Sequence, residues 1–374
     1  MADFFFYGTL CHAPLLAAVV GREVAVGPAT LEGYAVYWAN GRSFPMIVQQ
    51  AGARAVGVLA CGLSDADVAR LDYYEGGFAY DARLLMAKAA EGAVEARVYF
   101  PDTTQLTPGA PWSLQDWRAQ MGDVAVTAAG PFMRGFGVVP QEAARARYPA
   151  MLVTAAARLR AGIAAPTQVR RRASGMDTAV LAQGEGYAQY FSVEDYDLRF
   201  RRFDGEMSQP VRRAVWVSGD AATVLPYDPV RDRVVLIEQF RMGPFARGDR
   251  QPWMLEPIAG RIDPGETPEA AARREAEEEA GLHLGALWKV GGYYSSPGTV
   301  AEYLYAFVGQ ADLPDDAAGI GGLAAEHEDI RVHVLPFARA MELAASGEVE
   351  VGPTLLTLYW LAANRARLRA EVSV

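Results

Sequence analysis

The sequence is short of cysteine, of histidine and of long apolar runs, and each shortage excludes a class of protein. Cys11 and Cys61 are the two cysteines in 374 residues, so no disulfide framework is indicated and a reducing cytoplasm is the expected location. The four histidines do not stand beside cysteines at zinc-site spacing. No apolar stretch is long enough to span a bilayer, and the start of the sequence lacks the basic residues and long apolar core of a signal peptide. We therefore expect no membrane contact.

Positive charge is also in short supply. The 35 Lys and Arg residues face 45 Asp and Glu residues, a net charge of −10. Nucleic-acid binding depends on a basic surface for phosphate contacts, so we expect no nucleic-acid partner. What is present, 51% apolar and 21% charged residues, is typical of globular proteins, and the length exceeds one ordinary core. The composition therefore predicts two domains.

The most informative segment runs from Gly260 to Leu282. A glycine-bounded loop leads into a predicted helix, with Thr267 as N-cap, Pro268 at the first helical position and Gly281 as C-cap. These signals fix both ends of the helix.

Three carboxylates converge on one side of this predicted helix. Glu275 and Glu279 lie one turn apart, with Glu278 beside them. Because like charges at this spacing repel, a positive partner is expected, and hard divalent cations prefer carboxylate oxygens. The alternative is a solvated acidic helix face, the usual fate of a charge run. The glycine turn and the ordered spacing favour the metal site.

Written as G-x5-E-x7-R-E-U-x-E-E-x-G-U, with U apolar, the segment resembles the Nudix box at every fixed position. Nudix enzymes split nucleoside diphosphates linked to another group, using Mg²⁺ or Mn²⁺ held by this helix. The resemblance implies an α/β/α sandwich with a mixed sheet, which we place at residues 176–374. It implies Glu275, Glu279 and the carbonyl of Ala259 as metal ligands, and Glu278 as a catalytic carboxylate. The residues implied to shape the box are Gly260, Glu266, Arg274 and Gly281.

Two segments outside the box narrow the substrate class. Ser296, in a Ser-Pro-Gly turn that is followed by Glu302, resembles the ADP-ribose pyrophosphatase branch. Glu326-His327-Glu328 resembles the late acidic loop of that branch, where one glutamate activates the attacking water and another assists the metals. We assign Glu326 as the base and Glu328 to the metals, with their order left open. The implied substrate is ADP-ribose, hydrolysed to AMP and ribose 5-phosphate.

Further residues suit the binding of such a substrate. Arginines grip phosphate through a bidentate fork, an aromatic ring stacks on adenine, and carboxylates accept hydrogen bonds from ribose or base. The residues predicted to bind substrate are Tyr190, Arg213, Arg241, Glu256, Ser296 and Glu302. Each also has an ordinary reading as a surface arginine, a core tyrosine or a solvated polar group. The branch exchanges strands between subunits, so the resemblance implies a homodimer in which Tyr190 and Arg213 reach the partner's site.

Residues 1–140 differ in character from the rest. The predicted strands are Phe4–Phe6, Gly33–Trp38, Ala55–Ala60, Leu84–Ala87 and Ala93–Phe100, and the predicted helices are Pro14–Val20 and Ser64–Tyr74. This mixture predicts a small α+β barrel, and thus an α+β two-domain protein overall. The alanine-rich stretch 141–161 favours helix. With the basic run Val169–Arg172, which we read as a solvated edge, it is predicted as a helical linker over 141–175.

The first half carries a second chemical motif. Tyr7-Gly8-Thr9-Leu10 follows an apolar strand start, and its glycine can shape a turn that presents backbone N–H groups to a ligand. With Leu71-Asp72-Tyr73-Tyr74-Glu75-Gly76, it resembles the γ-glutamylcyclotransferase-like (AIG2-like) fold, a small β-barrel with helices. The resemblance implies substrate binding by Tyr7, Gly8, Thr9 and Leu10, and proton transfer by Glu75. The family's Tyr-x-Arg pair appears here one residue wider, as Tyr80 and Arg83, which puts the substrate-carboxylate contact in doubt.

Alternatives stay open for both halves. An alternative for the Nudix half is a hydrolase of another nucleoside diphosphate derivative, a nucleotide sugar or a dinucleotide, with a non-catalytic ligand-binding domain in front of it. The Ser-Pro-Gly turn argues against this alternative. A glutamate before two glycines is also an ordinary turn. A third reading is a ligand sensor without turnover, against which the intact carboxylates of the Nudix half speak. The sequence gives no reason for the fusion of the two halves.

Overall fold

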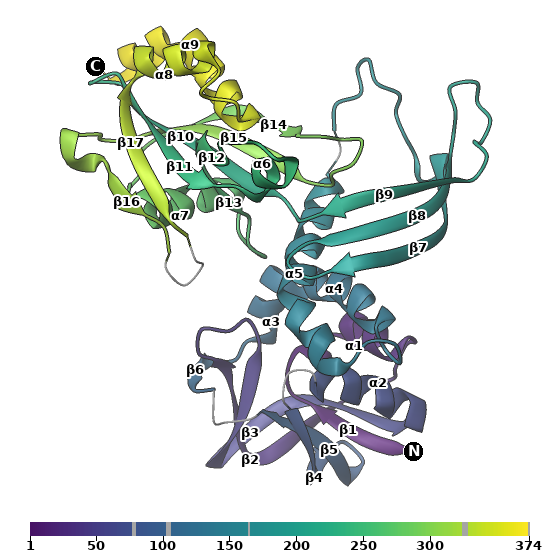
Figure 1. Cartoon of the computed structure of the whole chain (residues 1–374). Helices are drawn as coiled ribbons and strands as arrows, with labels where there is room; N and C mark the ends of the chain where they lie inside the picture. The colour runs from purple at the N-terminus through teal and green to yellow at the C-terminus, as the bar shows by residue number, and fades with distance from the viewer. Residues whose placement is uncertain (77–79, 102–105, 164, 324–327, 373–374) are drawn as a thin grey trace. The chain divides into compact units, whose positions relative to one another are not determined.

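The computed structural model of the protein describes residues 1–76, 80–101, 106–163, 165–323 and 328–372. These residues form two compact units, one of Met1–Gln168 with Ala188–Tyr190, the other of Val169–Tyr187 with Phe191–Val374 (Figure 1). Among the described residues, no helix combines the length and the apolar character needed to cross a bilayer.

The N-terminal unit is built on a closed five-stranded barrel. Its strands follow the order β3-β1-β5-β4-β2, and β2 pairs with β3 to close the circle, while β6 adds to β2 outside it. The strands are β1 (Ala2–Phe6), β2 (Gly27–Ala39), β3 (Pro45–Leu63), β4 (Tyr80–Ala89), β5 (Gly92–Pro101) and β6 (Pro108–Pro111). The predicted barrel is confirmed, and each of the five predicted strands lies within one of β1 to β5.

Strand β1 shows how the sequence divides its apolar side chains between two cores. Successive side chains of a strand point to opposite faces. Phe5 packs with Leu31 and Ile47 in a buried cluster that draws on all five barrel strands, so this cluster is the barrel interior. Phe4 and Phe6 pack in a second cluster with the helices of the unit. The run of three phenylalanines therefore joins the barrel to its helical cover.

The helical cover includes more helix than the sequence predicts. Its elements are η1 (Thr9–Cys11), α1 (Ala13–Val20), α2 (Asp65–Gly76), α3 (Leu114–Trp117), the π-helical turn η2 (Arg118–Gly122), α4 (Asp123–Arg134) and α5 (Gln141–Ala161). Helices α1 and α2 confirm the two predictions. Helix α4 was not predicted because Gly130-Pro131 is typical of a break. Burial of Ala128, Ala129 and Phe132 in the core holds the helix together across that pair.

Helix α5 confirms the helix that we predicted over 141–161. We assigned that helix to a linker, but it packs into the first unit. Ala155 and Ala156 are buried in the same core as α1 and α4. The amide of Gln141 donates hydrogen bonds to the carbonyls of Asp72 at 2.6 Å and Tyr73 at 2.8 Å, near the end of α2. Its alanines thus form a packing face, and the division between the units falls after Gln168.

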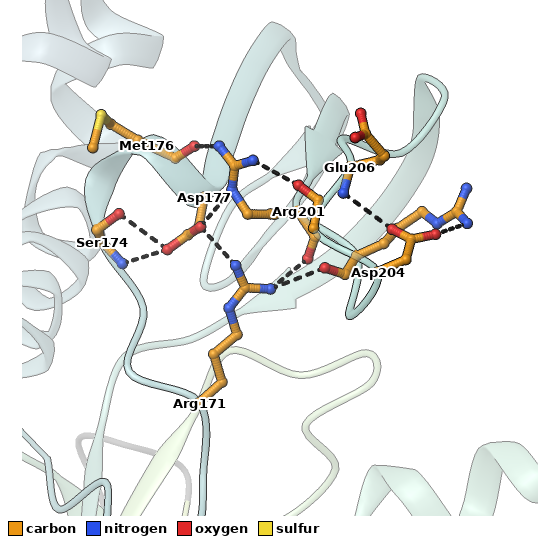
Figure 2. Close-up of polar contacts among 9 residues, drawn as sticks. Arg171, Ser174, Met176, Asp177, Arg201, Asp204 and Glu206 are labelled. Carbon is orange, nitrogen blue, oxygen red and sulfur yellow. Dashed lines mark hydrogen bonds and ion pairs between the residues drawn. The ribbon is translucent and has the colours of Figure 1, made fainter.

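The segment that opens the second unit is held by one carboxylate (Figure 2). Asp177 accepts hydrogen bonds from Arg171 at 2.8 Å, from Arg201 at 2.9 Å and from the N–H of Ser174 at 2.7 Å. Arg171 also donates to the carbonyl of Arg201 at 2.9 Å. The short helix η3 (Gly175–Asp177) is capped by these contacts. Part of the basic run predicted as a solvated edge is therefore anchored to the second unit.

A three-stranded antiparallel sheet follows, formed by β7 (Thr178–Ala188), β8 (Ser192–Phe200) and β9 (Val211–Val217). Strand β7 is exposed along nearly its whole length. Strand β9 connects to the Ser-Pro-Gly turn, because Trp216 donates its N–H to the carbonyl of Thr299 at 2.9 Å and accepts from Ala301 at 2.8 Å. This small sheet therefore holds the turn that we predicted to contact substrate.

The main sheet of the second unit is mixed and lies between helices, which confirms the predicted α/β/α sandwich. Its order is β14-β15-β10-β11-β17-β16, with β12 on β11 and β13 on β10, and β10 runs parallel to β15. The strands are β10 (Ala221–Asp228), β11 (Arg233–Phe240), β12 (Trp253–Glu256), β13 (Ile258–Arg261), β14 (Leu287–Tyr294), β15 (Tyr303–Gln310), β16 (Gly319–Gly321) and β17 (Ile330–Pro336). The helices are α6 (Met242–Arg247), α7 (Pro268–Ala280), η4 (Asp315–Ala317), α8 (Phe337–Ser346) and α9 (Gly352–Val372).

Alternation along the central strands explains this layering. On β11, Val235 and Ile237 pack in the cluster that includes α7, whereas Val234 and Leu236 pack in the cluster that includes α8 and α9. A strand that is apolar on both faces requires cover on both sides. Figure 1 shows α7 on one face of the sheet and α8 and α9 on the other.

Asp232 ties the last helix to the turn between β10 and β11. It adopts a positive φ of 59°, which aspartate tolerates better than most residues. Its carboxylate accepts hydrogen bonds from the Tyr227 hydroxyl at 2.9 Å and from Arg365 at 2.6 Å, and it lies 3.1 Å from Arg369. Burial works against ionisation of this carboxylate, but the bonds from Arg365 and Tyr227 lower its pKa. The C-terminal helix is therefore docked by charge as well as by its apolar face.

Replacing Asp232 by alanine is expected to lower the free energy of unfolding by about 2–4 kcal/mol, because two arginines and a tyrosine lose their shared acceptor. Urea denaturation measures this loss. Asp232→Asn keeps the backbone tolerance and one acceptor oxygen, so it should cost less. A loss below about 0.5 kcal/mol for the alanine variant, the size of an ordinary surface change, would contradict this role.

Candidate active site

Helix α7 begins and ends where the sequence predicts. The side chain of Thr267 accepts a hydrogen bond from the N–H of Ala270 at 3.1 Å. Gly281 adopts the left-handed conformation, with φ 64°, and closes the helix with its N–H on the carbonyl of Glu277 at 2.9 Å. Ala271, Ala272 and Ala276 are fully buried against the sheet. Because the alanines take the sheet side, the carboxylates are left to face the loop that precedes the helix.

Arg274 organises these carboxylates. It binds Glu266 through two hydrogen bonds of 3.0 Å, Glu275 at 2.6 Å and Glu278 at 2.9 Å. It also donates to the carbonyl of Arg261 at 2.9 Å. A planar guanidinium with five donors suits such a role, and the surrounding carboxylates raise its pKa. Glu266 and Arg274, which the resemblance implies to shape the box, therefore connect the loop to the glutamates of the helix.

Glu279 is the most buried carboxylate of the group, with 2% of its surface exposed. Its one close donor among the described residues is the N–H of Ala259 at 3.2 Å. Burial, with repulsion from Glu275 and Glu328, raises its pKa to about 9, although the Ala259 N–H and Arg241 act in the opposite direction. A buried carboxylate in this state favours a proton or a cation as its partner.

Glu275 shares this environment. Burial raises its pKa to about 7, against the lowering effect of Arg274, with further repulsion from Glu278 and Glu328. Its carboxylate lies against the backbone of Gly260, where a Cβ atom would come within 1.8 Å of Oε1. A glycine is thus required for Glu275 to reach its place beside β13.

The late acidic loop is described in part. Glu328 accepts a hydrogen bond from the N–H of Leu323 at 3.1 Å, and its charge acts on both Glu275 and Glu279. It therefore lies on the side of the helix that we predicted. Glu326, our predicted base, and His327 lie outside the described residues.

The donor set fits a hard divalent cation. It consists of the carboxylates of Glu275, Glu279 and Glu328, with the backbone of Ala259 beside them, and oxygen is the ligand atom that such cations prefer. Between the described residues, no three Asp, Glu, His or Cys side chains already stand at metal-binding distance from one another. Burial is the main cause that raises the pKa of Glu275 and Glu279, and repulsion among the carboxylates adds to it. A bound cation would offset both effects.

Arg241 and Glu256, both predicted to bind substrate, form one ion pair. Arg241 donates to Glu256 at 2.7 Å, and Gln239 adds a weaker contact to the same oxygen at 3.3 Å. Burial raises the pKa of Glu256, which Arg241 partly offsets. Arg241 also acts on Glu279, so the pair lies beside the carboxylates of α7. No motif in the sequence indicates Gln239.

Glu302 and Ser296 lie at the other predicted segment. Glu302 accepts a hydrogen bond from Ser218 at 3.2 Å, and burial raises its pKa, with Arg261 opposing and Asp220 adding to the effect. Ser296 is exposed and lies 3.3 Å from the hydroxyl of Thr299 within its turn. Ser218 was missed by sequence reasoning because it carries no motif.

Tyr190 and Arg213 stand apart from this group in their exposure. Tyr190 lies between β7 and β8 with 70% of its surface exposed. Arg213 is exposed on β9, where its guanidinium donates to the carbonyl of Arg212 at 2.9 Å. Their part in a partner's site stays a prediction.

A second candidate site lies in the N-terminal unit. A pocket with about 750 Å³ of empty space, its open mouth included, is lined by Tyr7, Gly8, Thr9, Leu10 and Glu75 together with aromatic and apolar side chains. The structure therefore brings both predicted segments to one pocket. Burial raises the pKa of Glu75 to about 8. Gly8 allows the close approach of Pro45, whose Cγ would lie 2.7 Å from an added Cβ.

Arg83 is not among the residues that line this pocket. It is exposed, and its guanidinium lies over the ring of Phe100 at 4.6 Å from the centroid. Among the described residues, Arg83 therefore does not contribute to the lining of the pocket. This agrees with the departure of its spacing from the family's Tyr-x-Arg pair.

The raised pKa of Glu75 predicts a pH effect on stability. Because burial favours the protonated form, the contribution of Glu75 is fully present below its unfolded pKa of about 4.5 and is lost as pH rises through about 8. Between these values the wild type should lose up to about 1.4 kcal/mol per pH unit relative to Glu75→Gln, which does not titrate. Urea denaturation of both proteins across this range measures the difference. A difference that does not change with pH would contradict the buried environment.

The comparisons with known proteins identify the families of both domains. Residues 217–355 match the family described as NUDIX domain, and residues 4–119 match the family described as Gamma-glutamyl cyclotransferase, AIG2-like. With the box on α7 in place, the chain belongs to the Nudix family and is a Nudix pyrophosphohydrolase that carries an AIG2-like domain.

Its relatives narrow the class to enzymes of nucleoside diphosphate derivatives. The ADP-ribose pyrophosphatase of Escherichia coli strain K12 is 42% identical over 195 residues, which is 52% of this chain and 92% of that protein. The ADP-ribose pyrophosphatase of Haemophilus influenzae is 37% identical over 198 residues, 52% and 91% of the two chains. A GDP-mannose pyrophosphatase of Salmonella typhimurium is 38% identical over 173 residues, 46% and 88%. Nudix hydrolases generally use divalent metal ions, and the carboxylates of α7 are suitable ligands for such ions.

Proposed function

We propose that the C-terminal domain hydrolyses the pyrophosphate bond of ADP-ribose, with Mg²⁺ as the metal (Mn²⁺ as a substitute), to AMP and ribose 5-phosphate. The observation that carries this proposal is the carboxylate group of α7, held by Arg274 beside the Arg241–Glu256 pair. The similarity to ADP-ribose pyrophosphatases over nine-tenths of their length supports the choice of substrate.

Each residue has a part in this reaction. Glu275, Glu279, Glu328 and the Ala259 carbonyl would hold the metal ions, which would neutralise the pyrophosphate and acidify a bound water. Arg274 keeps Glu275 and Glu278 in place through its hydrogen bonds. Arg241, fixed by Glu256, offers its remaining N–H groups to a phosphate. Glu326 takes the proton of the attacking water in this proposal.

The alternative is a nucleotide sugar, since the Salmonella relative is named for GDP-mannose. The test compares kcat/KM for ADP-ribose, GDP-mannose, NADH and FAD with Mg²⁺, after removal of metal with EDTA and readdition. We expect ADP-ribose to exceed the others by at least about tenfold, a difference of about 1.4 kcal/mol. A larger kcat/KM for GDP-mannose would overturn the proposed substrate, and full activity in EDTA would overturn the metal.

A homodimer that completes each site is a further part of this proposal. Exposed β7 and the exposed Tyr190 and Arg213 support it. Mixing inactive Arg213→Ala with inactive Glu279→Gln tests it, because a mixed dimer would contain one site with both residues. Recovery of activity on mixing is expected, and a monomer by light scattering would contradict the arrangement.

For the N-terminal domain we propose a γ-glutamylcyclotransferase with Glu75 as the proton carrier. The supporting observation is that Glu75 lines a pocket together with Tyr7–Leu10 and has a pKa near neutrality. The α-nitrogen of the substrate would attack its γ-carbonyl carbon, the amide C–N bond would break, and Glu75 would carry the proton from the attacking to the leaving nitrogen. The products would be 5-oxoproline and an amine.

Incubation of the full chain with γ-glutamyl amines tests this second activity. We expect 5-oxoproline from the wild type and from Glu142→Gln, an exposed carboxylate on α5, but about 10²–10⁴-fold less from Glu75→Gln. Equal release of 5-oxoproline by the two variants would show that Glu75 takes no part in the reaction. No release from the wild type would leave the domain a ligand-binding module.

A further inference from the structure

The last turn of α2, which carries Glu75, is bound by the first residue of α5. The side-chain amide of Gln141 donates to the backbone carbonyls of Asp72 at 2.6 Å and of Tyr73 at 2.8 Å. The last carbonyls of a helix have no partner within it, so donors from outside fix the end of the helix. Gly76 leaves room for this contact, because an added Cβ would lie 2.7 Å from Nε2 of Gln141. The amide therefore fits closely against the turn that contains Glu75.

Two tyrosine hydroxyls of the same turn are bonded to the same part of the chain. Tyr73 donates to the carbonyl of Val139, just before α5, at 3.0 Å. The hydroxyls of Tyr74 and of Tyr148 on α5 share a hydrogen bond of 3.1 Å. The three residues that precede Glu75 are thus each bonded to α5 or to the residues that lead into it.

The carboxylate of Glu75 has no comparable bond of its own. Among the described residues, none donates a hydrogen bond to it, and burial is the one cause that raises its pKa. It nevertheless lines the pocket together with Tyr7–Leu10. Its place there is therefore set by the backbone that carries it. A misplacement of about 1 Å at a reacting group costs about 10²-fold in rate, so the bonds to this backbone matter for catalysis.

This support comes from outside the parts of the chain that match known families. The AIG2-like match covers residues 4–119 and the NUDIX match covers residues 217–355. Helix α5 (Gln141–Ala161) lies in neither, although it packs in the core of the N-terminal unit. The family match alone therefore does not indicate a role for α5 in the pocket.

We propose that Gln141 is a positioning residue for Glu75, and that α5 is thereby part of the N-terminal site. Its amide holds the last turn of α2 so that the carboxylate stays in the pocket beside Tyr7–Leu10. The effect on the reaction rests on the proposed cyclotransferase. The effect on the ionisation of Glu75 does not, because it requires no turnover.

Rates of the full chain give the first test. The substrate is the γ-glutamyl amine that the wild type converts fastest to 5-oxoproline. We expect Gln141→Ala to lower kcat by about 10-fold to 10²-fold, because the carboxylate moves from the reacting atoms. KM should stay close to that of the wild type, since Tyr7–Leu10 is unchanged. The matched control is Glu142→Ala, which changes the neighbouring, exposed residue of α5 and should keep both constants.

The ionisation of Glu75 gives a test that needs no substrate. Urea denaturation compares each of the wild type and Gln141→Ala with its own Glu75→Gln derivative. In the wild type, the stability relative to Glu75→Gln should decline from pH 4.5 to about pH 8. In Gln141→Ala the freed turn lets water reach the carboxylate, which lowers its pKa. The decline should then end at least about one pH unit lower, a tenfold change in proton affinity.

Two features make this readout specific to Glu75. A merely structural role of Gln141 would lower stability equally at every pH and leave the range of the decline unchanged. The other titratable groups that line the pocket stay neutral in this range, because burial raises the pKa of each of these tyrosines: Tyr7, Tyr74, Tyr80, Tyr99 and Tyr148.

Gly76→Ala reaches the same contact from the other side. Its Cβ would displace the amide of Gln141, so kcat should fall about threefold to tenfold in the wild type. In Gln141→Ala the space is free, and the second change should cause no further loss, as is typical of residues in contact. Should Gln141→Ala fail to fold, the rate and the pH range of Gly76→Ala test the proposal.

Three results would overturn the proposal: a pH range in Gln141→Ala equal to that of the wild type, an unchanged kcat in Gln141→Ala, or losses that add independently in the double variant. Absence of 5-oxoproline from the wild type would instead contradict the cyclotransferase, and the pH range would then decide on Gln141 alone.

Discussion

Replacing Glu279 by glutamine is expected to lower kcat/KM for pyrophosphate hydrolysis by about 10²–10⁴-fold, since a metal ligand supplies several kcal/mol and each ~1.4 kcal/mol is a factor of ten. Glu279 is the most buried carboxylate of α7, and its close neighbours are Glu275, Glu328 and one backbone N–H. Glutamine keeps the shape and the acceptor oxygen but removes the negative charge. Steady-state rates with Mg²⁺ measure the loss.

A stability measurement separates this effect from unfolding. The neutral amide no longer repels Glu275 and Glu328, so the melting temperature of Glu279→Gln should equal or exceed that of the wild type. The matched control is Glu277→Gln, which removes an exposed carboxylate from the same helix. It should retain full activity. Loss of activity in the control, or none in Glu279→Gln, would contradict the assignment.

The sequence predicts helix α7 to the residue, because its ends depend on local chemistry. A threonine N-cap, a proline in the first turn and a C-cap glycine act within a few residues of the chain. The placement of Glu275 and Glu279 follows from the helix period alone. What the local pattern does not predict is which acid is buried, because that depends on the distance to β13 and Ala259.

The packing of α4 and α5 shows the opposite case, although the helical character of 141–161 was predicted. Their alanines carry a weak apolar signal, and the Pro131 and Pro149 within them are typical of breaks. Packing against the barrel and against the other helices of the unit decides their place, and this depends on residues far apart in the sequence. A stretch that reads as a linker therefore becomes a wall of the pocket.

The two sites also differ in how a buried glutamate is compensated. Glu275 and Glu278 share an arginine within the same turn of helix, which the sequence shows directly. Glu75 shares its pocket with tyrosines from α2, β4, β5 and α5 and with Tyr7 after β1. The sequence gives no spacing that would assign Tyr99 or Tyr148 to this pocket. The first site is thus local and predictable, whereas the second is created by the tertiary fold.

Gly260→Ala is expected to reduce pyrophosphatase activity by about 10²-fold, because a misplacement of about 1 Å at a reacting group costs that much. An added Cβ would lie 1.8 Å from Oε1 and 2.0 Å from Cδ of Glu275. The carboxylate is the free end of a flexible side chain, so it can swing away and let the protein fold. In doing so it leaves its hydrogen bond with Arg274 and its place beside Glu279.

Two readouts make this prediction specific. The affinity for Mg²⁺, from the metal dependence of the rate, should fall with kcat, while the melting temperature changes by a few degrees at most. The control is Gly291→Ala in β14, where an added Cβ meets nothing within 4 Å and φ needs no glycine. That variant should keep its activity and metal affinity. If Gly260→Ala also retained its activity and metal affinity, Glu275 would not need its position against β13, which its raised pKa and its short bond to Arg274 indicate. The metal site would then have to be built on the remaining carboxylates.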